Sequence, residues 1–257
     1  MLYNLHGRLC PNPWFFLAFM NMVDKSGDRV KKMFAEIAPK YDLMNHVLSL
    51  NIDTLWRRWT VRSLKLNQID PVLDVCTGTG DLALAISRKH GGVFPVIGSD
   101  FCLPMLERAR SKQVVSNPRD SNLSFIEADT EQLPFPDNQF QAVTVAFGIR
   151  NVSQTLRGLG EMFRVCKPGG TVAILEFSRP TFFGLSQLYD AYFRWVLPRI
   201  GQSLSKNDQS AYNYLPASVR EFPSGQAMLD LMASVGLKQL KQTPMTFGVA
   251  TLYVGIK

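Results

Sequence analysis

Short apolar runs alternate with amphipathic segments along most of the chain. Runs of strand length and composition occur near residues 72–76, 93–99, 123–127, 141–147 and 171–176. Between them, the pattern near residues 81–90, 102–113 and 153–166 predicts helices. Such alternation is typical of an α/β fold with a parallel sheet. Two last runs, 237–242 and 249–255, are joined closely enough to predict an antiparallel pair added to that sheet.

Residues 24–68 are predicted to form a helical cap ahead of the first strand. Apolar side chains recur there at spacings of three and four, at Val30, Met33, Phe34, Ile37 and Ala38. Pro39 is expected to end this helix, and a second helix is expected from Leu55 to about Leu66. Two roles stay open for the segment: ordinary packing at the sheet edge, or cover over a bound ligand.

Residues 180–223 interrupt the alternation of strands and helices and are predicted to form an insertion. Apolar residues fall on one helical face from Phe182 to Val196, and Phe183 and Phe193 add aromatic bulk beside that face. Such a stripe is usually part of a core. Because it follows the carboxyl end of a strand, where open α/β sheets bind their ligands, a lid over an apolar substrate is the alternative.

A strand-to-helix turn at residues 74–81, DVCTGTGD, contains two glycines spaced as G-x-G. Gly78 and Gly80 allow positive φ and close approach of a ligand to the backbone. The third glycine of the dinucleotide fingerprint is missing. Asp74 lies within the first strand, and Asp100 follows the next one, where an acid binds ribose hydroxyls. A ribose without a diphosphate suggests S-adenosylmethionine, although G-x-G alone can be an ordinary tight turn.

Composition limits the class of protein without choosing a partner. At 257 residues the chain fits one large domain. The net charge of +7 is compatible with nucleic acid or with an anionic membrane surface. Four scattered cysteines and three dispersed histidines give no metal-ligand spacing, so no metal site is predicted. No window approaches the roughly 18–20 apolar residues of a membrane-spanning helix.

Five motifs together resemble the ubiquinone/menaquinone biosynthesis C-methyltransferases, of the demethylmenaquinone methyltransferase type. They are residues 74–81, 129–135 (DTEQLPF), 146–152 (AFGIRNV), 189–192 (YDAY) and 246–250 (TFGVA). The glycine turn is general among class I methyltransferases, whereas FGIRNV and YDAY are far more specific. The resemblance covers residues 24–257 and leaves residues 1–23 as an unmatched tail.

This resemblance implies a class I S-adenosylmethionine-dependent fold: a seven-stranded Rossmann-like sheet with an antiparallel last strand. It also implies S-adenosyl-L-methionine as the cofactor and a polyprenylated quinol as the substrate. Demethylmenaquinol is the favoured acceptor, and 2-methoxy-6-polyprenyl-benzoquinol, of ubiquinone biosynthesis, is the nearest alternative. With such a substrate we expect a cytoplasmic protein peripheral to the inner membrane, and a homodimer is a further expectation.

The motifs place the family's cofactor contacts at the strand ends. Thr79 and Asp100 match such contacts, as do Asp129 and Thr130, which lie where an acid or amide meets the adenine. The glycine turn adds Asp74, Gly78 and Gly80. The family often has serine where this chain has Ala146, so a hydroxyl contact is absent there, and Ala146 is expected to contact the cofactor through its backbone or by packing.

The chemistry of such a methyl transfer suggests the catalytic residues. Methylation of a ring carbon requires a neighbouring phenolate. Arg150, which stays protonated, is assigned to stabilise that phenolate or a hydroxide-like water, and Asn151 to orient it. A surface salt bridge is the plain alternative for Arg150. Tyr41 is assigned to the cap over the cofactor, and it is a candidate base together with Asp42 and His46.

Two rival functions come from other classes. An RNA methyltransferase suits the positive charge, but the chain has no basic cluster interleaved with aromatic residues. No nucleic-acid partner is therefore predicted. A non-catalytic methyltransferase-like scaffold is disfavoured by the intact Thr79, Asp100, Arg150 and Asn151.

Overall fold

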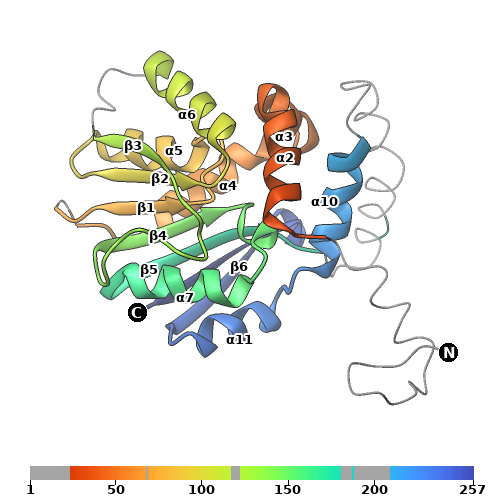
Figure 1. Cartoon of the computed structure of the whole chain (residues 1–257). Coiled ribbons are helices and arrows are strands. Elements are labelled where there is room, and N and C mark those ends of the chain that lie inside the picture. Colours follow the sequence, from red (N-terminus) through yellow and green to blue (C-terminus); the bar gives the residue numbers. More distant parts are fainter. Residues whose placement is uncertain (1–23, 68, 117–121, 181–186, 188–208) are drawn as a thin grey trace, which may run out of the picture.

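A seven-stranded sheet forms the centre of the computed structural model, which describes residues 24–67, 69–116, 122–180, 187 and 209–257 (Figure 1). The strand order is β3-β2-β1-β4-β5-β7-β6. The strands are β1 (Val72–Val75), β2 (Val96–Asp100), β3 (Leu123–Glu127), β4 (Phe140–Ala146), β5 (Cys166–Phe177), β6 (Lys238–Met245) and β7 (Ala250–Ile256).

The register of the strands confirms the predicted topology. The pairs β1–β2, β2–β3, β1–β4 and β4–β5 are parallel. The last strand, β7, runs antiparallel to both of its neighbours, β5 and β6. Because the first five strands are parallel, their carboxyl ends meet at one edge of the sheet.

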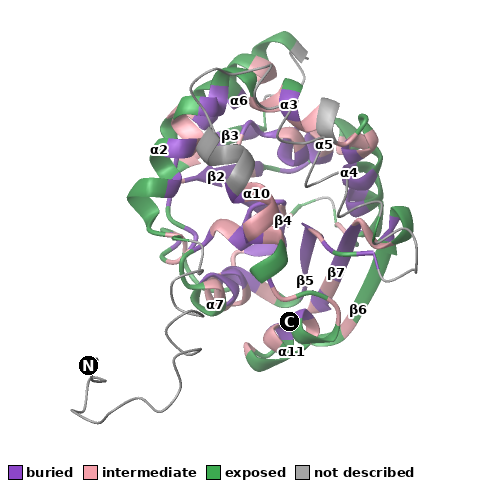
Figure 2. Cartoon of the chain, turned by 90° about the vertical axis from the view of Figure 1, so that its right-hand side faces the viewer, coloured by how far each residue is buried: buried purple, intermediate pink, exposed green. Residues whose placement is uncertain are grey.

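Helices cover both faces of the sheet (Figure 1). One apolar cluster joins α4 (Ile52–Ser63), α5 (Asp81–His90) and α6 (Leu103–Ser116) to one face. A second joins α7 (Thr155–Val165) and α11 (Gln226–Ser234) to the other. The central strands are buried between these layers, as Figure 2 shows in purple. The continuous apolar runs of the sequence are therefore strands covered on two sides.

The cap contains one more helix than the sequence predicts. Its elements are α2 (Gly27–Ile37), the 3-10 turn η1 (Ala38–Lys40), α3 (Tyr41–Leu48) and α4. Pro39 lies in η1, so it ends α2 as expected. The helix expected from Leu55 begins earlier, at Ile52, and ends at Ser63. The eight-residue α3 was missed because its sequence, YDLMNHVL, is too short for a clear helical period.

Several strand boundaries also differ from the prediction, among them the following two. The run expected from residue 93 becomes a strand only at Val96, because Gly91 and Gly92 take positive φ in the preceding turn and Pro95 has no N–H to donate to the ladder. Residues 167–170, which separate the predicted helix 153–166 from the predicted strand 171–176, lie inside β5. In the pairing of β5 with β4, Cys166 lies opposite Phe140 and Thr171 lies opposite Ala142. The register between the two strands therefore shifts over residues 167–170.

Part of the predicted organisation lies outside the described residues. This holds for the tail 1–23, the motif 189–192 and the stripe from Phe182 to Val196, of which only residue 187 is described. From the insertion 180–223 the structure describes α10 (Gln209–Glu221), which packs beside α2 (Figure 1). Within the described ranges, no helix is both long and apolar enough to cross a membrane.

Candidate cofactor pocket and catalytic site

A pocket lies where the cap meets the carboxyl ends of the strands. It encloses about 910 Å³, part of it open to solvent. Nine of the eleven residues predicted for the site line it: Tyr41, Asp74, Gly78, Thr79, Asp100, Asp129, Thr130, Ala146 and Asn151. Gly80 and Arg150 are not among the lining residues. Most of the predicted residues therefore gather at one pocket, and their roles there stay predictions.

The glycine turn has the geometry that its sequence predicts. Gly78 and Gly80 both take positive φ, 56° and 80°. A Cβ atom on Gly80 would lie 2.8 Å from Cζ of Phe125. Gly80 is therefore required by the packing of the turn, whereas Gly78 faces the pocket.

Asp74 fixes this turn from inside the sheet. Its carboxylate accepts hydrogen bonds from Oγ1 of Thr77, at 2.6 Å, and from Oγ1 of Thr144, at 2.7 Å. Burial raises the pKa of Asp74 to about 6. Much of the hydrogen-bonding capacity of Asp74 is thus used by the protein itself, which gives this acid a structural part in the pocket wall.

Asp100 ends β2 and presents a carboxylate held by backbone amides. Oδ2 accepts from the N–H of Gly78 at 2.8 Å, and Oδ1 accepts from that of Cys102 at 2.9 Å. Burial raises the pKa of Asp100 to about 6 as well. Each carboxylate oxygen can accept a further bond. A ribose diol, which donates two adjacent hydroxyls, suits such an acceptor.

Residues at or after the ends of β3 and β4 also line the pocket. Oδ1 of Asp129 accepts from the N–H of Glu131 at 2.8 Å, and Oγ1 of Thr130 lies 3.2 Å from Sγ of Cys76. After Ala146 the chain turns closely over the end of β1. A Cβ atom on Gly148 would lie 2.4 Å from that of Cys76. This glycine therefore permits the close approach of the FGIRNV loop to the glycine turn.

A network of charged side chains fastens the cap to the glycine turn. Oγ1 of Thr79 donates to Oδ1 of Asp42 on α3 at 2.5 Å. Nζ of Lys112 on α6 donates to Oδ2 of Asp42 at 3.1 Å and also pairs with Asp81. Arg57 on α4 pairs with Asp53, and its Nη2 lies 3.5 Å from Oδ2 of Asp81. The predicted cofactor contact Thr79 is thus also a contact of the cap.

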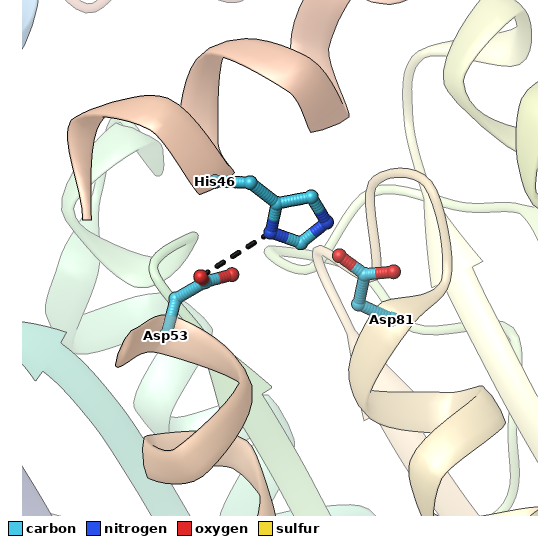
Figure 3. Close-up of side chains that lie close together, drawn as sticks. All are labelled: His46, Asp53 and Asp81. Atoms are coloured by element: carbon cyan, nitrogen blue, oxygen red, sulfur yellow. Dashed lines mark hydrogen bonds and ion pairs between the residues drawn. The ribbon is translucent and has the colours of Figure 1, made fainter. Parts of the chain in front are cut away.

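His46 meets two of these acids at the edge of the network (Figure 3). Its Nδ1 lies 3.3 Å from Oδ1 of Asp53, and one ligand atom from each of His46, Asp53 and Asp81 falls within 4.8 Å of the others. Sequence spacing did not predict this group. Both acids are already paired with cations, Arg57 and Lys112, so the donor set does not favour a divalent ion. The imidazole is not among the pocket-lining groups.

Arg150 forms a buried ion pair. It lies in η2 (Ile149–Asn151) with only 5% of its surface exposed. Nη1 donates to Oε1 of Glu176 at 2.7 Å and to the carbonyl oxygen of Phe147 at 2.5 Å. Arg150 therefore does form a salt bridge, as the alternative interpretation held, but the pair is buried inside the protein and not on its surface. Its catalytic role stays a prediction.

Asn151 and Tyr41 both line the pocket. Oδ1 of Asn151 is buried and has no hydrogen-bond partner among the described residues, and the residue is part of the pocket lining. The Tyr41 ring packs edge-on against Phe34, with 6.0 Å between centroids. Burial raises the pKa of Tyr41, which keeps its hydroxyl protonated and makes it a poor base.

Sequence reasoning missed several partners of the site. Arg57, Asp81 and Phe147 line the pocket. Lys112 donates to Thr79, which lines the pocket, and Glu176 pairs with Arg150, which does not. One signal was present: Asp53 and Arg57 are four residues apart, the spacing of an ion pair on a helix. The other contacts join distant segments, and no local pattern indicates them.

Taken together, the pocket can hold a nucleoside-like group. One wall offers the Asp100 carboxylate, another offers Asp129 and Thr130, and Phe34, Phe101 and Met105 supply apolar surface. Asn151, whose Oδ1 has no partner among the described residues, also belongs to the lining.

Comparison with known proteins agrees with this geometry. Residues 22–257 match the ubiE/COQ5 methyltransferase family. The ubiquinone/menaquinone biosynthesis C-methyltransferase UbiE of Geobacter sp. (strain M21) is 46% identical over 93% of this chain and 100% of its own length. The demethylmenaquinone methyltransferase of Bacteroides fragilis is 41% identical over 91% of this chain and 94% of its own length.

Solved structures share the fold at low sequence identity. A SAM-dependent methyltransferase from Thermotoga maritima has a TM-score of 0.62 at 18% identity, covering 89% of this chain and 99% of that one. A methyltransferase described as S-adenosyl-L-methionine-dependent, from Methanococcus maripaludis, has a TM-score of 0.60 at 16% identity, covering 87% and 93%. These likenesses show the class I methyltransferase fold. The family match over nearly the whole described chain goes further: this protein belongs to the ubiE/COQ5 methyltransferase family.

Proposed function

We propose that this chain transfers a methyl group from S-adenosyl-L-methionine to a ring carbon of a polyprenylated quinol. Demethylmenaquinol is the favoured acceptor, and 2-methoxy-6-polyprenyl-benzoquinol is the alternative. The observation that carries the proposal is the family match over residues 22–257 together with relatives named for this chemistry. The pocket at the strand ends supports it, because its donor set suits the cofactor.

For the cofactor site, we propose roles for four residues. Asp100 accepts from the ribose hydroxyls, since its carboxylate lines the pocket with lone pairs left over from its two amide bonds. Asp129 and Thr130 lie beside the adenine. Thr79 turns from Asp42 toward the cofactor or holds the cap over it. The bound cofactor supplies the methyl group, and the protein's task is to hold the acceptor carbon in line with it.

For the acceptor, we propose that Asn151 and Arg150 act together on the ring oxygen. Holding two reacting groups in line contributes several kcal/mol to such a transfer. The Asn151 amide faces the pocket and orients the oxygen. Arg150 lies behind it, paired with Glu176, so it acts on the developing phenolate through space and through the loop that it holds. Tyr41 closes the cap side as a neutral hydroxyl.

We also propose where the enzyme works. A polyprenylated quinol resides in a bilayer, so a cytoplasmic enzyme peripheral to the inner membrane fits this substrate. The aromatic stripe from Phe182 to Val196 stays our candidate for a lid over the acceptor, and it lies outside the described residues. The homodimer stays a prediction.

The quinone profile of cells that lack the gene tests the acceptor. We expect demethylmenaquinone to accumulate, and a plasmid copy to restore menaquinone. A copy carrying Asp100→Ala should fail to do so at equal protein level. Accumulation of the unmethylated benzoquinone instead assigns the alternative branch. An unchanged profile of both quinones would contradict the proposal.

A further inference from the structure

The outer face of α4 carries apolar and basic side chains together. Leu55, Arg58, Trp59 and Arg62 are all exposed and recur at spacings of three, four and seven. At 3.6 residues per turn they occupy an arc of about 100° on the helix. The residues of α4 that pack inward, among them Trp56, Thr60 and Val61, are on the opposite side. The exposed arc is therefore a continuous stripe along the helix.

Two of these side chains are large and apolar, which is unusual for a solvent-facing helix surface. Leu55 is 49% exposed and Trp59 is 59% exposed. Single exposed apolar residues are common, but a cluster marks an interaction site.

A third apolar side chain is held beside the stripe by the turn η4 (Thr246–Gly248). Phe247 is 79% exposed. Trp56 of α4 donates from Nε1 to Oγ1 of Thr246 at 2.8 Å, which joins η4 to the helix. Figure 2 shows α4 on the same side of the molecule as β6, the strand that leads into η4.

The turn is built to keep Phe247 outside. Thr246 and Phe247 both take positive φ, at 45° and 58°, a conformation that residues with side chains rarely adopt. Oγ of Ser178 donates to the carbonyl oxygen of Gly248 at 2.8 Å and fixes the other end of the turn. The two hydrogen bonds hold a strained backbone that presents an aromatic ring to solvent.

The charges of the stripe favour an anionic partner. Among the described residues, neither Arg58 nor Arg62 has an ion-pair partner, while other cations of the cap, such as Arg57, do. The chain as a whole carries a net charge of +7. Tryptophan and leucine next to arginine are the residue types that enter the headgroup region of a bilayer.

We infer that the Trp59 face, defined as Leu55, Arg58, Trp59, Arg62 and Phe247, docks on an anionic lipid bilayer. The apolar side chains enter the headgroup region, and the two arginines pair with lipid phosphates. The reason for docking rests on the proposed function, since a bilayer-resident acceptor requires it. The lipid contact itself can be tested without any quinol.

The face is one layer of side chains away from the pocket. Trp56 packs on Phe147 with 5.9 Å between ring centroids, and Phe147 lines the pocket. The same indole packs on Phe177 at 6.2 Å. Docking through the Trp59 face therefore places the catalytic pocket close to the lipid surface.

Co-sedimentation of the purified full chain with vesicles tests this inference. We compare vesicles of phosphatidylglycerol and phosphatidylcholine with vesicles of phosphatidylcholine alone. The wild-type chain should bind the anionic vesicles, less so at high salt because exposed charges are screened. The variant Trp59→Ser with Phe247→Ser should lose at least about tenfold in binding, as expected for two apolar side chains no longer buried.

The arginines have a separate signature. Arg58→Gln with Arg62→Gln should weaken binding to anionic vesicles roughly fivefold for each arginine and leave binding to neutral vesicles unchanged. Two matched controls lie on α7, which covers the other face of the sheet: Leu156→Ser removes an exposed leucine, and Arg157→Gln removes an exposed cation. Both controls should bind like the wild type.

Other outcomes overturn the inference. The lipid contact is excluded if the wild-type chain does not bind the vesicles, or if the Trp59→Ser/Phe247→Ser variant binds them as well as the wild type does. A shift from dimer to monomer in that variant, seen by ultracentrifugation, assigns the face to a second copy of the chain. The melting temperature should be unchanged, because these side chains are exposed. If vesicle binding follows the prediction while no quinol is methylated, the docking surface stands and the proposed function fails.

Discussion

The two sides of the pocket are held by different kinds of contact. On the strand side, Asp74 and Asp100 are buried and receive hydrogen bonds from short polar side chains and backbone amides. On the cap side, Asp42 and Lys112 form an ion pair whose side chains keep 19% and 27% of their surface exposed. Partly exposed ion pairs contribute little free energy. We therefore expect the cap to open when the cofactor enters, while the strand ends stay fixed.

The largest effect is expected from breaking the buried pair on the strand side. Glu176→Ala leaves the Arg150 guanidinium buried without its carboxylate, which should lower the free energy of unfolding by about 3–5 kcal/mol. Urea unfolding measures this change. Glu127→Ala is the matched control, because it breaks the exposed pair with Lys31 and should cost less than about 1 kcal/mol. Equal losses in both variants would show that burial does not decide the difference.

Asp100 should give the largest effect on cofactor binding. Charge-assisted hydrogen bonds contribute about 1.5–3 kcal/mol, so Asp100→Ala should weaken S-adenosylmethionine binding at least tenfold in calorimetry. Asp129→Ala is a second strand-end variant and should act less strongly, because adenine offers that side chain fewer donors than a diol offers Asp100. Unchanged binding in a folded Asp100→Ala variant removes this residue from the site.

The pKa of Asp100 predicts opposite effects of pH on binding and on stability. Burial raises the folded-state pKa to about 6, above the unfolded value of about 3.9. The folded chain therefore binds the extra proton between these values, and this contribution lowers stability as pH rises from about 4 to 6.

Cofactor affinity should change in the other direction. Protonation removes the charge that accepts from the ribose, so binding should weaken as pH falls below about 6, by up to tenfold per unit. Calorimetry between pH 5 and pH 8 measures this dependence. The Asp100→Asn variant should bind weakly with a much flatter profile. If cofactor binding by this variant keeps the pH dependence of the wild type, a group other than Asp100 causes that dependence.

The smallest effect is expected on the cap side. Lys112→Met removes the cation shared by Asp42 and Asp81. The loss of stability should stay near 1 kcal/mol or below, since the pair is partly exposed. Faster hydrogen exchange in α3 than in β1 and β2 is the sharper sign of a loosened cap. Lys31→Met, which breaks the exposed pair with Glu127, is the control and should leave exchange in α3 unchanged.

The sequence predicted the sheet and the pocket edge for a simple physical reason. Continuous apolar runs such as 141–147 belong to strands buried on both faces, and parallel strands bring their carboxyl ends together. Asp74 and Asp100, each at or near such an end, therefore had to approach one another. The resemblance of the FGIRNV motif then located Asn151 at the same edge, where it lines the pocket.

The remaining features depend on contacts that no local pattern carries. The pairing of Arg150 with Glu176 joins the η2 turn to β5, 26 positions later. Because of this pair, Arg150 is buried and does not line the pocket. Likewise, Lys112 lies on the predicted helix 102–113, but only the folded chain brings its ammonium to Asp42. Side chains of this kind become visible only after tertiary packing.

Direct transfer of an isotopic label tests the account most closely. Purified protein is incubated with methyl-labelled S-adenosylmethionine and demethylmenaquinol in anionic vesicles, and the quinone is analysed by mass spectrometry. The account predicts label on the ring carbon of menaquinone, and a strong loss of label with Asp100→Ala. Binding of the cofactor without label on either demethylmenaquinol or the benzoquinol would contradict it.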